Sequence, residues 1–363
     1  MDFDLSDDQR ALQSGAEELL RGLASAHAVR YFSNSEDFFD QALWGAMVEQ
    51  GWLGVGLAES EGGIGLGTVE LALLCESLGA HVAPVPFLQT VLARRACERA
   101  GRSDWVAALL GGDAVGCVAW SARPDAVVGD IDATGRWHLR GRPDPALYAC
   151  AASVAIVLAT TADGPALFVV SLDDIGRPSR EPAMDLTRPV SWLHFDGTDA
   201  ELLGGVDAAN ALENDGAALL ASEMLGAAQT VLDMTVAYAK DRVQFDKPIG
   251  SFQAVKHRCS DMLVDVEGMR STAYYAAWSI DTQHRDAAIA GSTAKCWASD
   301  ASERVMASGL QVHGGIGFTW EHDLHFFLKR AQADHRVFGD AHYHRERLVD
   351  LLRPRVDAGE VIV

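Results

Sequence analysis

Apolar residues recur at helical spacing over the first part of the chain, from Ser6 to about Leu110. Gln9 follows Ser6 at the spacing of a capping box, which predicts that a helix begins there. The stretches Gly62–Gly67 and Ala83–Pro86 interrupt the pattern, because glycine and proline disfavour continuation of a helix. The first part is therefore predicted to contain several helices joined by loops.

The pattern changes between Asp113 and about Gly204, where short apolar segments are separated by Gly, Pro and Asp, as is typical of a compact β domain. Long helical runs return from Asp207 to about Leu352. We therefore predict an α+β multidomain chain with a helical N-terminal domain (1–112), a middle β domain (113–206) and a C-terminal helical bundle (207–363). The predicted strands are 115–120, 137–139, 154–158, 166–170 and 190–195.

Composition narrows the class of protein. The chain has 30 Lys+Arg against 51 Asp+Glu, a formal charge of −21, which argues against a nucleic-acid or anionic-membrane surface but leaves room for a local basic pocket. Its six cysteines form no C-x-x-C pair, so we expect buried, reduced thiols rather than disulfides or a zinc site. The N-terminus, residues 1–8, is acidic, unlike a secretory signal, and the longest uncharged stretch, 146–162, is too short to span a bilayer. We expect a cytoplasmic protein.

The segment from Tyr238 to Lys256 is the first that suggests chemistry. A helix is predicted to end near Arg242, and Pro248 prevents a new one from beginning until about Ser251. Arginine at a helix end, beside Gln244 and Phe245, is suited to hold a phosphate while the aromatic ring stacks on a base. The alternative is a helix-turn-helix corner with a surface arginine.

The second informative segment is Gln311–Phe318, in which paired glycines follow a predicted helix. Such glycines allow the backbone to approach a ligand closely, or they simply cap the helix. The segment is not a dinucleotide-binding fingerprint, because it has no G-x-G-x-x-G and no strand precedes it.

Together, these two segments resemble the acyl-CoA dehydrogenase family. The family pattern Arg-x-Gln-Phe-Gly-x-Pro-Ile-x-x-Phe-Gln-x-x-Lys, followed later by Gln-x-x-Gly-Gly-x-Gly, is met at every fixed position except Asp246, where the family has Gly. The segment Ala58–Gly65 is similar to the family's Pro-Glu-x-x-Gly-Gly-x-Gly. The resemblance covers essentially the whole chain.

The resemblance implies a helical N-terminal domain, a middle β barrel and a C-terminal four-helix bundle, assembled as dimers or tetramers with FAD across a subunit boundary. Arg242, Gln244 and Phe245 would hold the diphosphate and adenine of FAD from one subunit, and Gln311 and Gly315 would contact the FAD of the neighbour. In the family reaction a carboxylate takes the α-proton of an acyl-CoA thioester while the β-hydrogen leaves as hydride to the flavin. Electron-transfer flavoprotein is the expected electron acceptor.

The chain departs from the family where the catalytic Glu belongs. One family position, a Glu-Arg pair, falls on Gly216-Ala217, and we expect the nearby Glu213 and Asp215 to have surface roles. The other, Glu-Gly-Thr near the C-terminus, leaves Asp340 as the nearest carboxylate. Asp340 is the candidate base, although its side chain is shorter than Glu, and N-capping of the last helix is the favoured alternative.

The family motif that lines the flavin in the middle domain is also reduced here, over residues 119–126, and the resemblance leaves Ser121 as one flavin contact. The histidines His335, His342 and His344 have no spacing that defines a metal site, so surface or capping roles are favoured and no metal is predicted.

Both departures fit one branch of the family, the α2β2 heterotetramers that act on steroid side chains, in which one subunit lacks the Glu. The hypothesis is therefore a subunit that pairs with a paralogous acyl-CoA dehydrogenase. A flavin-dependent oxidase or monooxygenase on the same fold, and a structural subunit without chemistry of its own, are the alternatives.

Overall fold

The computed structural model describes residues 4–360, so the first three residues of the acidic N-terminal stretch lie outside the described residues. The predicted helices of the first part are present. They are α1 (Asp7–Leu23), α2 (Ala26–Phe32), α3 (Gln41–Glu49), α4 (Thr68–Ala80), α5 (Phe87–Arg99) and α6 (Ser103–Leu110), with the 3-10 turns η1 (Trp52–Gly54) and η2 (Glu59–Glu61). The capping box is confirmed, because Ser6 Oγ accepts from Gln9 N at 3.1 Å and Gln9 Oε1 accepts from Ser6 N at 2.9 Å.

The glycine run between η2 and α4 is a loop that folds back on the preceding segment. A Cβ at Gly63 would overlap the carbonyl oxygen of Leu57, so the backbone can pass there only without a side chain. The backbone therefore requires glycine at this point.

The middle part of the chain is a β barrel. Strands β5, β2, β3, β8 and β6 pair in that order, and β6 pairs back to β5, which closes the ring; β1 pairs with β5 in parallel. The strands are β1 (Gly116–Ala119), β2 (Val127–Ile131), β3 (Trp137–Gly141), β5 (Val154–Thr161), β6 (Gly164–Ser171) and β8 (Phe195–Gly204), with short β4 (Ala146–Leu147) and β7 (Val190–Ser191) and helix α7 (Leu172–Ile175). Four of the five predicted strands are found, as β1, β3, β5 and β6. The fifth, 190–195, is reduced to the two-residue β7, and the half-exposed β2 and the long β8 were not predicted.

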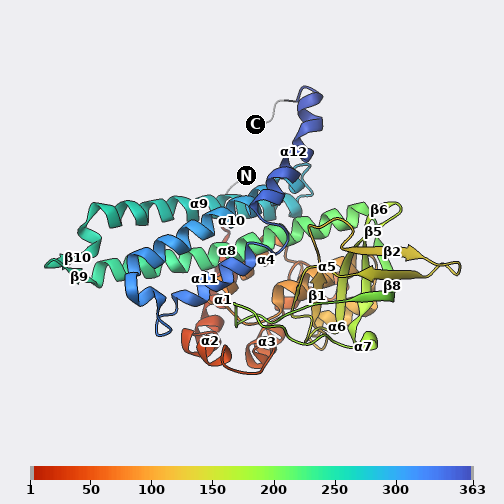
Figure 1. Ribbon diagram of the computed structural model, residues 1–363, viewed down its shortest axis with the longest axis horizontal. Coiled ribbons are helices and arrows are strands. Elements are labelled where there is room, and N and C mark those ends of the chain that lie inside the picture. The colour runs from red at the N-terminus through yellow and green to blue at the C-terminus, as the bar shows by residue number, and fades with distance from the viewer. Residues whose placement is uncertain (1–3, 361–363) are drawn as a thin grey trace. The chain divides into compact units, whose positions relative to one another are not determined.

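The C-terminal part is a bundle of long helices, as predicted (Figure 1). They are α8 (Val206–Asp241), α9 (Gln253–Asp281), α10 (Ala287–His313), α11 (Leu324–Asp334) and α12 (Ala341–Asp357), with the hairpin β9 (Val243–Gln244) and β10 (Lys247–Pro248) and the 3-10 turns η3 (Ile249–Ser251) and η4 (Gly314–Phe318). Helix α10 packs against α9, α11 and α12.

Helices α4 and α8 cross at a pair of glycines. A Cβ at Gly79 would overlap the carbonyl oxygen of Glu223, and one at Gly226 would overlap that of Glu76. The two backbones are therefore in direct contact at this crossing, and polar side chains of both helices lie beside it.

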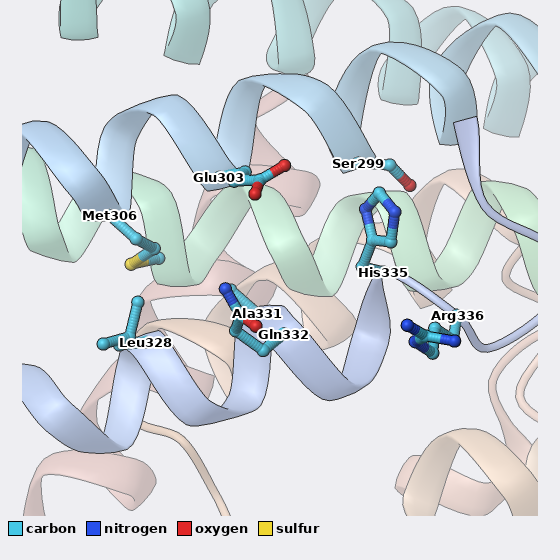
Figure 2. A pocket seen from close by; sticks show the side chains of 8 residues that line it. All are labelled: Ser299, Glu303, Met306, Leu328, Ala331, Gln332, His335 and Arg336. Atoms are coloured by element: carbon cyan, nitrogen blue, oxygen red, sulfur yellow. The ribbon is translucent and has the colours of Figure 1, made fainter. Parts of the chain in front are cut away.

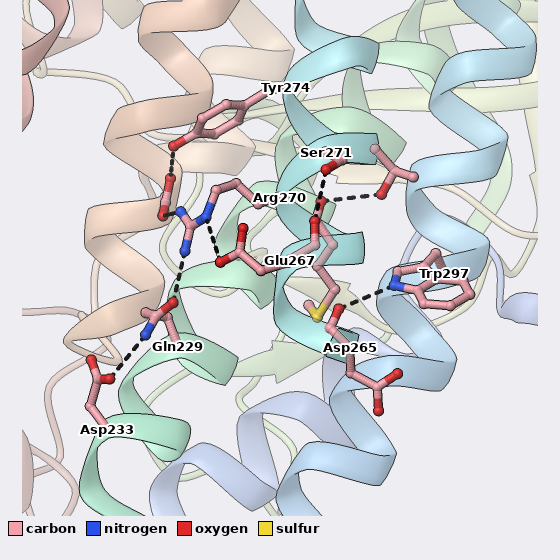
Figure 3. Close-up of polar contacts among 11 residues, drawn as sticks. Gln229, Asp233, Asp265, Glu267, Arg270, Ser271, Tyr274 and Trp297 are labelled. Atoms are coloured by element: carbon pink, nitrogen blue, oxygen red, sulfur yellow. Dashed lines mark hydrogen bonds and ion pairs between the residues drawn. The ribbon is translucent and has the colours of Figure 1, made fainter. Parts of the chain in front are cut away.

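One polar network, drawn in Figure 3, joins α4, α8 and α9 beside this crossing. Glu76 accepts from Arg270 at 2.7 Å and from Tyr274 at 2.6 Å, and Arg270 also donates to Gln229 at 2.7 Å. Burial, and then the neighbouring Glu76 carboxylate, raises the pKa of Tyr274, so its hydroxyl remains a donor. The network fixes the rotation of three helices relative to one another.

The described residues gather into two compact units. One comprises residues 4–29, 68–83 and 217–360, and the other residues 30–67 and 84–216. The three-domain boundaries at 112/113 and 206/207 stay a prediction. Among residues 4–360, no helix is long and apolar enough to cross a membrane.

Candidate functional site

The first candidate segment is an exposed hairpin that joins α8 to α9. Helix α8 ends at Asp241, β9 and β10 pair, and the two turn residues Phe245 and Asp246 have φ values of 54° and 63°. Two consecutive positive φ values define the type I′ turn of tight hairpins, which favours Gly or Asn and tolerates Asp. This explains why the family has glycine at the position of Asp246. It also explains why aspartate is tolerated there better than most other side chains.

The side chains of this hairpin are available to a ligand. Phe245 is 85% exposed, and Arg242 and Gln244 are also exposed. Within residues 4–360 the Arg242 guanidinium has no hydrogen-bond or ion-pair partner. The predicted corner is confirmed, and it presents an unpaired cation beside an exposed ring.

The second candidate segment follows α10. Its glycine cap is confirmed: Gly314 has φ 61° and its N–H bonds to the Leu310 carbonyl, after which the chain turns through η4. Gln311 and Gly315 are exposed, and the nearby rings of Phe318 and Trp320 are exposed as well.

A stack of rings, which was not predicted, ties the two segments together. His313 stacks on Tyr238 with ring centroids 4.6 Å apart, and His322 meets His313 edge-on at 4.6 Å. His313 Nδ1 donates to the Gly309 carbonyl, and burial lowers the pKa of His313, so the ring is neutral near pH 7. The ends of α8 and α10, which carry Arg242 and Gln311, are thus held at one end of the bundle.

The carboxylates near the first family base position are buried, so the expectation of surface roles for Glu213 and Asp215 is wrong. Asp215 is 1% exposed and accepts from Arg95 at 2.8 and 3.3 Å, while Arg99 lies 2.7 Å away. Burial raises the pKa of Asp215, but the two arginines outweigh it and hold the pKa below the usual range. The expected surface role of Asp215 is wrong because α5 supplies two arginines that pair with its carboxylate.

The carboxylate near the second family position is a helix cap. Asp340 Oδ1 accepts from the backbone N–H of Tyr343 at 2.9 Å at the start of α12, which confirms the capping alternative. That hydrogen bond, together with nearby histidines, lowers the pKa of Asp340. A base for an activated thioester needs a raised pKa, so this environment opposes that role.

A buried lysine that was not predicted also donates hydrogen bonds to the backbone of the segment 335–340. Lys295 is 0% exposed, and its Nζ donates to Ser299 Oγ at 2.9 Å, to the His335 carbonyl at 3.1 Å and to the Gly339 carbonyl at 2.8 Å. His344 Nε2, equally buried, donates to the Phe338 carbonyl at 2.8 Å. These bonds fix the backbone in the region where the family places its Glu-Gly-Thr motif.

Gly339 shows how closely this segment is fitted. It has φ 89°, and a Cβ there would overlap the ring of Tyr343. We expect Gly339→Ala to lower the free energy of unfolding by about 2–4 kcal/mol, measured by urea denaturation. Gly135→Ala is the matched control, because Gly135 has φ 86° with open space around it. Equal losses in the two variants would show that the Tyr343 contact contributes nothing.

Comparison with known proteins identifies the family of this chain. Models of the acyl-CoA dehydrogenase N-terminal and C-terminal domains match residues 6–112 and 204–352. Acyl-CoA dehydrogenase IpdE2 of Mycolicibacterium smegmatis is 33% identical over 95% of this chain and 98% of its own length. This chain belongs to the acyl-CoA dehydrogenase family.

Solved structures of family members agree over the whole chain. A chain of the ChsE4-ChsE5 complex from Mycobacterium tuberculosis superposes with a TM-score of 0.90 at 29% identity, covering 100% of both chains. A chain from a variant of the Tcur3481-Tcur3483 steroid ACAD gives a TM-score of 0.90 at 28% identity, covering 97% of this chain and 99% of that one. The acyl-CoA dehydrogenase fold, including the middle barrel, is therefore confirmed.

In this member of the family, the Ser121 side chain forms hydrogen bonds to residues of the same β domain. Its hydroxyl donates to Asp144 at 2.9 Å and accepts from the Arg123 backbone at 3.1 Å. A flavin contact by Ser121 stays a prediction.

Proposed function

We propose that this chain is one subunit of a hetero-oligomeric, FAD-dependent acyl-CoA dehydrogenase, and that the base for the reaction comes from a paralogous subunit. One contrast carries the proposal. The segments that the family uses toward FAD are exposed, and the Arg242 guanidinium has no partner among residues 4–360, whereas the carboxylates near the two family base positions, Asp215 and Asp340, hold structural positions.

The exposed residues suit the chemistry of FAD. Arg242 offers a cation for the diphosphate, Phe245 offers a ring face for the adenine, and Gln244 and Gln311 offer amide groups for hydrogen bonds. Gly315 leaves its backbone open to close approach by the neighbour's cofactor. When bound, FAD would accept the hydride from the β-carbon of the substrate.

Asp340 as this chain's own base is the less well supported assignment. Its carboxylate caps α12, and its lowered pKa reduces its ability to take the α-proton of a thioester. A paralogous subunit with the family Glu would supply the missing group.

The names of similar structures support a proposal for the substrate class and the assembly. One superposing structure comes from a steroid ACAD with two named components, and another from a two-protein complex. We infer an acyl-CoA with a bulky group such as a steroid side chain, electron-transfer flavoprotein as acceptor, and a cytoplasmic location. The absence of a family Arg at Ala217 supports shared binding of the anionic CoA.

The test is to purify the chain alone and together with a paralogous subunit and to record the flavin absorbance of each. We expect the chain alone to retain little FAD and to catalyse no dehydrogenation. The mixture should retain FAD and dehydrogenate the acyl-CoA. In that mixture, Arg242→Met should weaken FAD retention by about tenfold or more, because a charge-assisted bond to phosphate is lost. Lys240→Met, an exposed cation nearby, is the control and should leave FAD retention unchanged.

A chain that alone binds stoichiometric FAD and oxidises an acyl-CoA, and loses that activity in Asp340→Asn, would overturn the partner proposal. Rapid reoxidation of the reduced flavin by air would instead favour an oxidase or monooxygenase. A third outcome would indicate a structural subunit. In that case the mixture holds flavin and oxidises the acyl-CoA by means of the partner's base, and Arg242→Met changes neither FAD retention nor activity.

A further inference from the structure

A pocket of about 190 Å³ lies between α10 and α11, and none of the residues predicted to hold FAD is among those that line it (Figure 2). Residues of both helices line it, together with His335 and Arg336, which follow α11. About 150 Å³ is enough for a benzene-sized molecule, so the pocket admits a ligand of about six to nine non-hydrogen atoms.

The two ends of the pocket differ in chemistry. Met306, Leu328 and Ala331 form an apolar end, and His335 and Arg336 lie at the opposite end, as Figure 2 shows. A ligand that fills the pocket therefore needs an aliphatic part and a polar part.

The polar end is suited to a carboxylate. Within residues 4–360 the Arg336 guanidinium has no ion-pair or hydrogen-bond partner, so it can bind an anion without giving up another contact. Ser299 adds a hydroxyl: its oxygen accepts from buried Lys295 at 2.9 Å, which leaves its proton free to donate. The charge of Lys295 itself is opposed by Asp334 and Asp340, so Arg336 is the main cation.

Glu303 supplies the opposite charge on the wall between the two ends. Its carboxylate also has no ion-pair or hydrogen-bond partner in the described part of the chain. An anion without a compensating cation would be repelled by Glu303, whereas an ammonium group beside the carboxylate would pair with it.

We propose that this pocket binds a free aliphatic α-amino acid as a zwitterion. The carboxylate pairs with Arg336 and the Ser299 hydroxyl, the ammonium pairs with Glu303, and the side chain packs against Met306 and Leu328. All the polar groups of such a ligand find an opposite partner, and its size matches the volume. The proposal does not depend on FAD or on a partner subunit.

The test is calorimetric titration of the full-length protein, as purified, with L-leucine. We expect saturable binding with a Kd of about 1 mM or tighter. Isocaproate, which lacks the ammonium, isoamylamine, which lacks the carboxylate, and glycine, which lacks the aliphatic side chain, should each bind at least about tenfold more weakly.

Two variants of exposed residues locate the site without disturbing the core. Arg336→Gln and Glu303→Gln should each weaken leucine binding by about tenfold, and Glu303→Gln should remove the preference for leucine over isocaproate. Arg353→Gln, an exposed arginine of α12, is the control. The absence of saturable binding up to about 20 mM, equal affinity for isocaproate in the unaltered protein, or unchanged binding in both variants would overturn the proposal.

Discussion

Replacing Lys295 with methionine is expected to lower the free energy of unfolding by about 2–5 kcal/mol at pH 7. The ammonium donates to three oxygens, two of them backbone carbonyls in the segment 335–340, and methionine has no donor to replace it. Two of the acceptors, on Ser299 and Gly339, are buried, so water does not compensate fully. Urea denaturation, followed by circular dichroism, measures the loss.

The same substitution should change the pH dependence of stability in a defined direction. Burial lowers the pKa of Lys295 to about 7, whereas the unfolded chain keeps a value near that of free lysine. The unfolded state therefore binds more protons between about pH 7 and 10, so this group adds stability as the pH rises through that range, by at most about 1.4 kcal/mol per unit. The difference between the parent protein and Lys295→Met should grow accordingly.

The control is Lys240→Met, which removes an exposed ammonium at the end of α8. It should change stability by less than about 0.5 kcal/mol and leave the pH profile unaltered. If Lys295→Met behaved like this control, the three hydrogen bonds would not stabilise the segment 335–340.

The local features were predictable because their causes lie within a few residues. The Ser6–Gln9 capping box, the break at Pro248 and the short apolar strands of the barrel all follow from neighbouring side chains. For the same reason the exposed corner at Arg242 and the glycine cap after α10 were foreseen. Family resemblance, rather than pattern, supplied the link from these segments to FAD.

The structural roles of charged residues were not predictable, because their partners are distant in sequence. Lys295 reaches carbonyls 40 and 44 residues away, and Asp215 meets an arginine 120 residues away. Nothing near Asp215 in the sequence distinguishes a buried ion pair from a solvated face. The His313 stack is a similar case, although an aromatic residue one turn before Arg242 and a histidine inside the glycine motif were available signals.

Replacing Asp215 with asparagine is expected to destabilise the protein by about 3–5 kcal/mol at pH 7, because it removes the buried negative charge that pairs with buried Arg95. Arg99, which is partly exposed, can turn toward water and accounts for less of the loss. The stabilising contribution of the Asp215 carboxylate is present above the pKa of an unfolded aspartate and is lost as the pH falls through its lowered folded value, so the gap between the two proteins should close in acid.

Asp104→Asn is the matched control for Asp215→Asn, because Asp104 pairs with Arg102 near the surface at 2.8 Å. The control variant should lose no more than about 1 kcal/mol of stability.

The comparison also separates a structural role from a catalytic one at the first family base position. If the ion pair is structural, Asp215→Asn should lose much stability, and the part of the variant that still folds should remain active in the flavin-loaded assembly. A catalytic carboxylate predicts the reverse, an intact fold with the dehydrogenation abolished. The contacts of Asp215 with two arginines support the first outcome, and with it a subunit whose base must come from elsewhere.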